Sequence, residues 1–171
     1  MGNHFMKLIR FLNALFILVL CGVLCNGYVI QFYFHEQPCP FCMLQRLSMM
    51  GVACGPALNL RFGIRPLHYG MSLLASLFGA AVGLRQIAYH VCQSFATYEW
   101  SVLGFYIFTW GFIVFVCSMI AISLFLLLYK KDELPVKMNL FEKFVILFIL
   151  ILALANAITT FQECGLTACA A

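Results

Sequence analysis

Residues 38–46, PCPFCMLQR, combine two cysteines and an arginine at spacings that suit redox chemistry. Two residues separate Cys39 from Cys42, and Arg46 follows Cys42 by four residues, which places it on the same face of a helix. Pro40 favours the first turn of a helix, where its missing N–H costs nothing. Cys39 would then lie near the N-cap and Cys42 in the first turn, where unpaired N–H groups favour a thiolate. The pattern predicts a redox-active cysteine pair beside a fixed positive charge.

Three less reactive interpretations stay open for these residues. A structural disulfide between Cys39 and Cys42 would close almost no chain and would therefore stabilise the fold little. A zinc site would need two more ligands, which Cys164 and Cys169 would have to provide from a loose C-x4-C spacing. Arg46 would, in the third interpretation, be an interfacial residue that extends its charge toward lipid headgroups.

A dithiol pair that turns over must pass its electrons to an acceptor. At a membrane surface a lipid-soluble quinone is the natural acceptor, because its pocket needs apolar walls and only a few polar groups. The apolar runs before and after residues 35–39 would supply the walls. Arg46 would supply a cation for the quinone oxygen.

The segments that must hold these residues are apolar enough to make lipid their solvent. Of the 171 residues, 64% are hydrophobic and 9% are charged, whereas a soluble domain carries roughly 25% charged residues. Each apolar run has about the 20 residues needed to cross ~30 Å of hydrocarbon, and backbone hydrogen bonding in lipid requires helices. We predict an all-α membrane protein, a four-helix transmembrane bundle plus a fifth span, in one membrane domain of residues 1–171. The predicted spans cover about residues 11–34, 40–60, 67–91, 101–129 and 144–161.

Basic residues near the ends of these spans predict their orientation, because such residues collect on the cytoplasmic side. An N-in, C-out arrangement makes eight of the ten lysines and arginines cytoplasmic and puts only Arg46 and Arg85 toward the outside. Cys39 and Cys42 then face a compartment that is oxidising in a bacterium. The formal charge of +4 is too small and scattered for nucleic-acid binding, so no nucleic-acid partner is expected. The cytoplasmic residues are Lys7, Arg10, Arg61, Arg65, Lys130, Lys131, Lys137 and Lys143.

Three segments resemble the DsbB family of membrane disulfide-bond-forming proteins. They are PCPFCMLQR at 38–46, GLRQIAYH at 83–90 and EWSVLGFYIFTWGF at 99–112, and the resemblance extends over about residues 8–129. It implies a four-helix bundle in the bacterial inner membrane, with redox loops that face the periplasm. It also implies electron flow from a periplasmic DsbA-like thiol oxidase to a second cysteine pair, then to the C-x-x-C, and finally to a quinone, either ubiquinone or menaquinone.

The same resemblance implies roles for the residues of the first motif. Cys42 would engage the quinone, Cys39 would be its exchange partner, and Arg46 would be the quinone-side cation. No metal is expected.

The sequence departs from the family where the second cysteine pair should lie. The family's second outer loop is long and carries that pair, but here about nine residues, from Cys92 to Trp100, join the spans, with Cys92 as their only cysteine. The fifth span ends in QECGLTACAA, which places Cys164 and Cys169 on the outside. The second pair is therefore Cys164 with Cys169, or Cys92 with one of them, or absent.

Two rival functions stay open beside a quinone-linked thiol oxidase. One is a quinone and thiol oxidoreductase similar to vitamin K epoxide reductase, although no match to its loop sequence is present. The other is a non-enzymatic membrane bundle, structural or transporting, whose C-x-x-C is incidental or binds a metal. The predicted spans lack acidic residues, which argues against an ion pathway.

Other polar and cysteine residues within the predicted spans are expected to be structural. A small-xxx-small pattern, GAAVG at 79–83, would let the third span pack closely on a neighbour. Four amide residues would bond between helices, and four cysteines would pack as small hydrophobic groups. The amides are Asn13, Asn26, Gln31 and Gln86, and the cysteines are Cys21, Cys25, Cys54 and Cys117.

Overall fold

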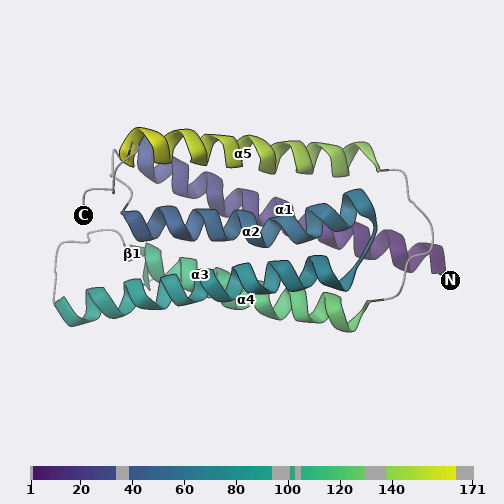
Figure 1. The fold of residues 1–171 in the computed structure, drawn as a ribbon, viewed down its shortest axis with the longest axis horizontal. Helices are drawn as coiled ribbons and strands as arrows, with labels where there is room; N and C mark the ends of the chain where they lie inside the picture. Colours follow the sequence, from purple (N-terminus) through teal and green to yellow (C-terminus); the bar gives the residue numbers. More distant parts are fainter. Residues whose placement is uncertain (1, 34–38, 94–100, 103–104, 130–137, 165–171) are drawn as a thin grey trace.

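The computed structural model describes residues 2–33, 39–93, 101–102, 105–129 and 138–164. These residues form five helices and one pair of two-residue strands (Figure 1). Strand β1 (Ser101–Val102) pairs antiparallel with β2 (Phe105–Tyr106) immediately before the fourth helix. The predicted helical membrane architecture is confirmed. The helices are α1 (Gly2–Tyr33), α2 (Pro40–Phe62), α3 (Pro66–Gln93), α4 (Ile107–Leu127) and α5 (Leu140–Cys164).

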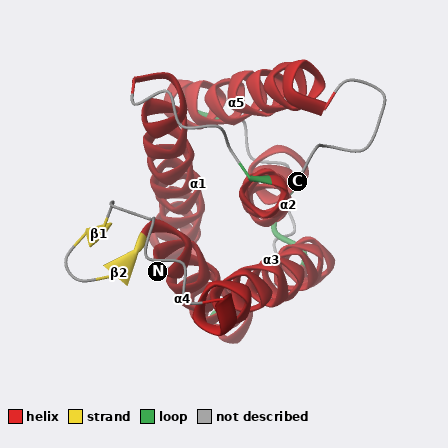
Figure 2. Ribbon diagram, turned by 90° about the vertical axis from the view of Figure 1, so that its left-hand side faces the viewer, coloured by secondary structure: helices red, strands yellow, loops and turns green. Residues whose placement is uncertain are grey.

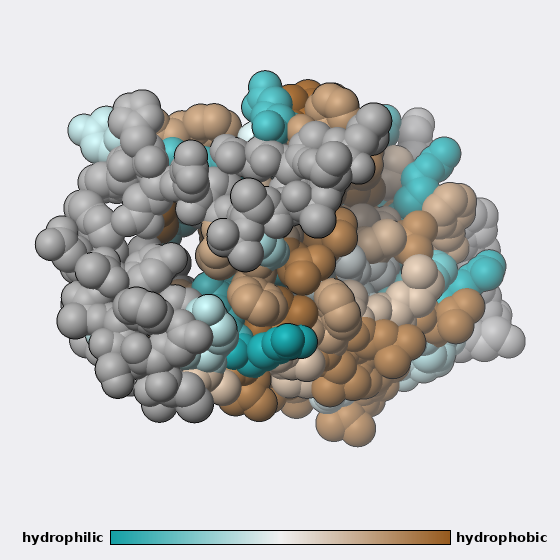
Figure 3. Space-filling model, turned by 60° about the vertical axis from the view of Figure 1, so that its left-hand side comes forward, coloured by the Kyte–Doolittle hydropathy of each residue, from teal (hydrophilic) through white to brown (hydrophobic). Residues whose placement is uncertain are grey.

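Among the described residues, four helices are both long enough and apolar enough to cross a membrane. Large hydrophobic side chains lie exposed on their outer faces, and hydrophobic residues dominate the described surface in Figure 3. Such a surface is unfavourable in water and favourable in lipid. The qualifying stretches are His4–Tyr33 in α1, Pro66–Tyr89 in α3, Phe108–Leu127 in α4 and Leu140–Gln162 in α5.

Helix α2 has the length of a span but is less apolar than the other four. Its 23 residues extend over about 35 Å at a rise of 1.5 Å per residue. It packs against α1, α3, α4 and α5, so its buried polar side chains face protein rather than lipid. The view from one end of the molecule in Figure 2 shows α1, α3 and α5 around it. The apolarity that lipid demands is thus relaxed on the face of α2 that packs against its neighbours.

Helix α4 begins at Ile107, later than the predicted start near residue 101. The residues before it extend as strands, because Ser101 pairs with Tyr106 and Val102 with Phe105. The α5 helix begins at Leu140, four residues before the predicted span.

Two glycines set how closely the central helices approach one another. A Cβ at Gly55 of α2 would overlap the Ser72 hydroxyl and the His68 carbonyl of α3. A Cβ at Gly79 of α3 would overlap the Phe115 ring of α4. Because Gly79 begins the GAAVG segment, the predicted close packing of the third span on a neighbour is confirmed.

Buried amide side chains bond between helices, as predicted for three of the four amide residues. Asn13 of α1 exchanges hydrogen bonds of 2.8 and 3.0 Å with the Tyr69 hydroxyl of α3. Gln31 and Gln86 make inter-helix bonds at the cysteine pair, described below. The prediction for Asn26 is wrong, because its side chain is exposed.

The predicted packing of the remaining span cysteines is confirmed only in part. Cys21 is fully buried in the core and Cys25 is partly buried, as small hydrophobic groups would be. Cys54 and Cys117 are exposed on the outer faces of α2 and α4.

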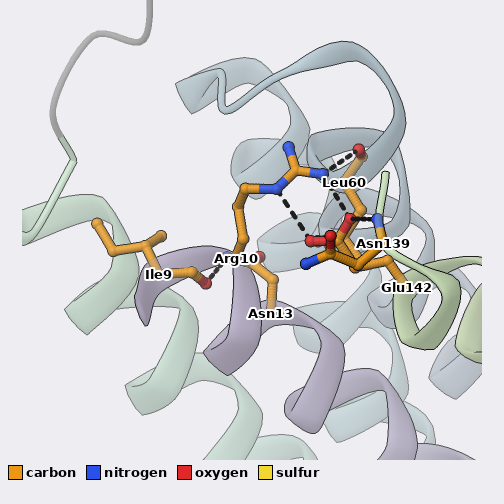
Figure 4. A network of polar contacts seen from close by, with 6 residues as sticks. All are labelled: Ile9, Arg10, Asn13, Leu60, Asn139 and Glu142. Atoms are coloured by element: carbon orange, nitrogen blue, oxygen red, sulfur yellow. Dashed lines mark hydrogen bonds and ion pairs between the residues drawn. The ribbon is translucent and has the colours of Figure 1, made fainter. Parts of the chain in front are cut away.

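The end of the bundle where α1 begins holds a buried ion pair (Figure 4). The Arg10 guanidinium donates to both carboxylate oxygens of Glu142, at 2.9 and 2.7 Å, and to the Leu60 carbonyl at 3.0 Å. The carboxylate also accepts from the Asn139 N–H at 3.0 Å, which caps the start of α5. Arg10 therefore joins α1, α2 and α5, whereas the sequence predicted only a role in topology. Glu142 lies in the first turn of α5. The predicted fifth span began near residue 144 and therefore did not include this acidic residue.

Candidate redox site

The cysteine pair lies where the chain enters α2. Cys39 is the N-cap, with extended backbone angles, and Pro40 follows at the first helical position. The Cys42 N–H donates to the Cys39 sulfur at 3.2 Å, so this sulfur satisfies a backbone donor that the first turn leaves free. Both side chains are partly buried. The predicted placement of the pair at a helix N-terminus is confirmed.

A side-chain amide from α3 contacts both sulfurs. The Gln86 Nε2 lies 3.4 Å from the Cys39 sulfur and 3.5 Å from the Cys42 sulfur. Its Oε1 accepts a 2.9 Å hydrogen bond from Gln45 Nε2 of α2. Both glutamine side chains are buried. The site is therefore built from two helices, with polar atoms that face one another inside an apolar bundle.

Arg46 lies one helical turn beyond Cys42 and is held by α1. Its Nη1 donates to Gln31 Oε1 at 2.6 Å, and its Nη2 donates to the Gly27 carbonyl at 2.9 Å. The guanidinium carbon is 4.9 Å from the centroid of the Tyr28 ring, a cation–π distance. These contacts fix the group in place but carry no negative charge. In the part of the chain that the structure describes, no carboxylate pairs with Arg46.

The surroundings of Cys39 change the proton affinity of its sulfur. Hydrogen bonding to the Cys42 sulfur, followed by burial, raises the pKa of the Cys39 thiol above its ordinary value. Cys39 therefore ionises less readily than an ordinary cysteine thiol. Arg46, one turn beyond Cys42, attracts negative charge on the Cys42 sulfur or on an acceptor beside it.

The structure brings three of the predicted site residues together, namely Cys39, Cys42 and Arg46. Cys92 lies in the last turn of α3 and Cys164 ends α5, but their side chains lie outside the described residues, and Cys169 lies wholly outside them. Figure 1 shows that α3 and α5 end on the side of the bundle where α2 begins.

Arg85, the second basic residue predicted to face outside, lies near the pair. Its guanidinium carbon is 5.8 Å from the centroid of the Phe41 ring, between the two cysteines in sequence. Within the described residues, no group of three His, Cys, Asp or Glu side chains is placed to hold a metal ion. The zinc site predicted as an alternative would use Cys164 and Cys169, whose side chains lie outside the described residues.

Sequence reasoning missed three contributors to the site. Gln86 was assigned to inter-helix bonding alone, and neither Gln45 nor Tyr28 was singled out. Gln45 immediately precedes Arg46, and Gln86 lies within GLRQIAYH, so both belonged to the segments that carried the family resemblance. Tyr28 offered no such signal, because only the packing of α1 on α2 brings its ring under Arg46.

A helical membrane protein with a capped cysteine pair, an amide at both sulfurs and a nearby arginine belongs to the class built for thiol–disulfide exchange. The chain matches the family described as "Disulfide bond formation protein DsbB" over residues 9–96, which is more than half of its length. It therefore belongs to the DsbB family. The match covers α1 to α3 and ends before the 99–112 segment and α5. Neither a curated protein nor a solved structure matches the chain.

Proposed function

We propose that this chain is a thiol oxidase of the bacterial inner membrane that reoxidises a periplasmic DsbA-like protein and passes the electrons to quinone. The observation that carries the proposal is Arg46, held by neutral groups beside Cys42. Within the described residues no carboxylate pairs with this guanidinium, which there retains its capacity to stabilise negative charge on a neighbouring group. The family match supports disulfide formation as the overall activity.

The surroundings of Arg46 suit a lipid-soluble acceptor. Val29 and Phe32 follow Tyr28 and Gln31 on α1, and Leu47 follows Arg46 on α2. All three apolar side chains are exposed. Apolar walls with one fixed cation are the features that a quinone ring with two carbonyl oxygens would require. The quinone supplies an acceptor for two electrons and two protons.

The reaction divides into two half-reactions that share one cysteine pair. In the first, the Cys39–Cys42 disulfide is reduced to two thiols while a dithiol outside the pair closes to a disulfide. In the second, the two thiols close again, and two electrons and two protons leave to the quinone. Cys42, which lies one helical turn from Arg46, engages the acceptor side, and Cys39 exchanges with the donor. Arg46 stabilises the negative charge that develops on the acceptor oxygen.

The test is anaerobic quinone reduction by the purified protein with a reduced DsbA-like partner. The intact chain should consume quinone catalytically, and Cys39→Ala or Cys42→Ala should abolish turnover. Cys117→Ala is the matched control, because this cysteine is exposed on α4 and should be dispensable. Turnover that persists in either site variant would eliminate the mechanism, whereas no turnover by the intact chain would favour a non-enzymatic bundle.

The shuttle between partner and pair is proposed to be Cys164 with Cys169, with Cys92 as the alternative. Support comes from the ends of α3 and α5, which lie on the side of the bundle where α2 begins (Figure 1). A protein in which both Cys164 and Cys169 are replaced by Ala should still be reduced by a small dithiol and reoxidised by quinone. It should fail to oxidise the protein partner. Full activity toward that partner would transfer the role to Cys92 or to direct exchange at Cys39.

The same proposal places the N-terminus in the cytoplasm and the cysteine pair toward the periplasm. Five of the seven described basic residues lie at the end of the bundle opposite the pair, namely Lys7, Arg10, Arg61, Arg65 and Lys143. Reporter fusions after Lys131 and after Ala171 should report cytoplasm and periplasm respectively. Reporters on one and the same side would remove the fifth span from the proposed topology.

A further inference from the structure

The Gln86 side chain is placed to act on the chemistry of the pair as well as on helix packing. Its amide nitrogen carries two hydrogens, and it lies within hydrogen-bond distance of both sulfurs, 3.4 Å from Cys39 and 3.5 Å from Cys42. Gln86 itself is 2% exposed, so water cannot readily replace it as a donor. Resting on the function proposed above, we propose that Gln86 is a further catalytic residue, whose amide stabilises negative charge on the sulfurs and thereby favours the reduced pair.

The direction of this effect follows from the acceptor strength of sulfur. A disulfide or a neutral thiol is a weak acceptor, whereas a thiolate is charged and binds an N–H donor more strongly. The Gln86 amide therefore stabilises the pair most after reduction, when one sulfur carries charge. Stabilising the reduced form makes a cysteine pair a stronger oxidant, which suits a protein that must withdraw electrons from another thiol oxidase.

The amide also serves the step in which charge moves from one sulfur to the other. One NH2 group faces both sulfurs, so Cys39 and Cys42 share a donor that need not move when the charged sulfur changes. A donor already in place costs no reorganisation when the charge develops.

Gln45 keeps the amide in the orientation that this role requires. It donates from Nε2 to Gln86 Oε1 at 2.9 Å, which turns the NH2 group of Gln86 toward the sulfurs. Gln45 is itself confined, because a Cβ at Gly111 of α4 would overlap its Oε1 and a Cβ at Gly83 of α3 would lie 3.4 Å from its Nε2. Gln45 is therefore a positioning residue that acts through Gln86.

The experiment measures the redox equilibrium of the Cys39–Cys42 pair in the full-length protein, in buffers of reduced and oxidised glutathione. Two glutathione molecules supply two electrons and two protons and become one oxidised glutathione. After acid quenching, mass spectrometry of the peptide that contains both cysteines gives the reduced fraction. Gln86→Leu should lower the equilibrium constant for reduction about tenfold, a shift of about 30 mV for a two-electron couple. Gln86→Glu, which replaces the donor by an acceptor, should lower it further.

Asn13→Leu is the matched control. Asn13 is also a fully buried inter-helix amide, but it bonds Tyr69 far from the sulfurs, so its loss should leave the equilibrium constant unchanged. Gln45→Leu retains the Gln86 side chain but removes the hydrogen bond that orients its amide. This variant should also lower the equilibrium constant for reduction of the pair, by a smaller factor than Gln86→Leu. This variant tests the proposal even where Gln86→Leu fails to fold.

A second readout separates a chemical role from a structural one. The second readout is the alkylation of Cys42 by iodoacetamide across a pH series, in a Cys39→Ala background. After Gln86→Leu, alkylation should reach the same rate only at a pH about one unit higher, because a tenfold loss of thiolate stabilisation is one pKa unit. If Gln86→Leu and Gln45→Leu both leave the redox equilibrium and the alkylation profile as in the unmodified chain, the amide only joins α2 and α3 and the proposal is overturned. Neither measurement uses quinone or a protein partner, so a failure of quinone reduction would leave this result intact.

Discussion

Arg10 and Arg46 carry the same charge into opposite ends of the bundle, but their partners differ. Arg10 is 4% exposed and donates to both oxygens of the Glu142 carboxylate, so its charge is neutralised within the fold. Arg46 is held by Gln31, by the Gly27 carbonyl and by the Tyr28 ring, all of them neutral. The first arrangement joins helices, whereas the second orients a cation that no described carboxylate neutralises. The partners of an arginine in a helical membrane bundle therefore indicate whether it serves structure or chemistry.

The largest expected effect lies at the Arg10 end. Glu142→Gln leaves a buried guanidinium without its counter-ion, which costs about 3–5 kcal/mol of stability when one partner of a buried pair is lost. The thermal midpoint of the detergent-solubilised protein should fall sharply. Quinone reduction per folded molecule should be unchanged, because the pair lies at the other end of the bundle.

A double variant sharpens this prediction. Arg10→Met together with Glu142→Leu removes both charges and should recover most of the lost stability. If Glu142→Gln is as stable as the unmodified protein, the ion pair does not hold α5. If it instead lowers activity per folded molecule, the division between the two ends is wrong.

An intermediate effect is expected at the cysteine pair. The pKa of Cys39 is raised chiefly by its hydrogen bond with Cys42, so its free thiol should be alkylated slowly near neutral pH. Cys42→Ala removes that cause and should lower the pKa of Cys39, although burial remains. At pH 8 the rate of Cys39 alkylation should therefore rise about tenfold for each unit by which the pKa falls.

The measurement is pulsed alkylation followed by peptide mapping across a pH series. Cys117, exposed on α4, provides an internal reference, because its profile should be the same in both proteins. An unchanged Cys39 profile after Cys42→Ala would show that the two sulfurs do not share a proton.

The smallest expected effect concerns the link between Arg46 and α5. The Tyr28 hydroxyl donates to the Leu152 carbonyl of α5 at 3.2 Å, while the Tyr28 ring lies under Arg46. Tyr28→Phe removes the hydroxyl and keeps the ring, at a cost of about 1 kcal/mol. We expect a KM for quinone that rises a few fold, with kcat nearly unchanged.

Tyr69→Phe is the control for this change. It removes a hydroxyl that bonds Asn13 near the other end of the bundle, so it should cost similar stability without moving the KM. Equal kinetics in the two variants would mean that α5 does not influence the orientation of Arg46.

The sequence predicted the elements whose signals are local. Apolar runs in the sequence predicted the positions of the helices, because a segment that crosses lipid must have a minimum length and must satisfy its backbone hydrogen bonds internally. Pro40 and the cysteine spacing placed the N-cap, because capping depends on neighbouring residues. The predicted face of Arg46 also followed from helical periodicity alone.

Contacts between distant helices could not be predicted in the same way. Arg10 and Glu142 lie 132 positions apart, and nothing near either residue specifies the other. The amide of Gln86 reaches the sulfurs across 44 and 47 positions, through the close approach of α2 and α3. The sequence therefore predicted an inter-helix contact for Gln86, and only the packing of α2 against α3 showed that its amide lies beside the two sulfurs.

The most direct test of the central claim measures the two half-reactions separately in one variant, Arg46→Gln. Reduction of the Cys39–Cys42 disulfide by a small dithiol is followed first, and reoxidation of the prereduced protein by quinone is then followed anaerobically in a single turnover. If the positive charge of Arg46 serves the acceptor, reoxidation should slow about 100-fold, the usual cost of losing one preorganised charge-stabilising group, while reduction changes a few fold at most. Equal slowing of both half-reactions, or no slowing of reoxidation, would contradict the account and assign Arg46 to the fold.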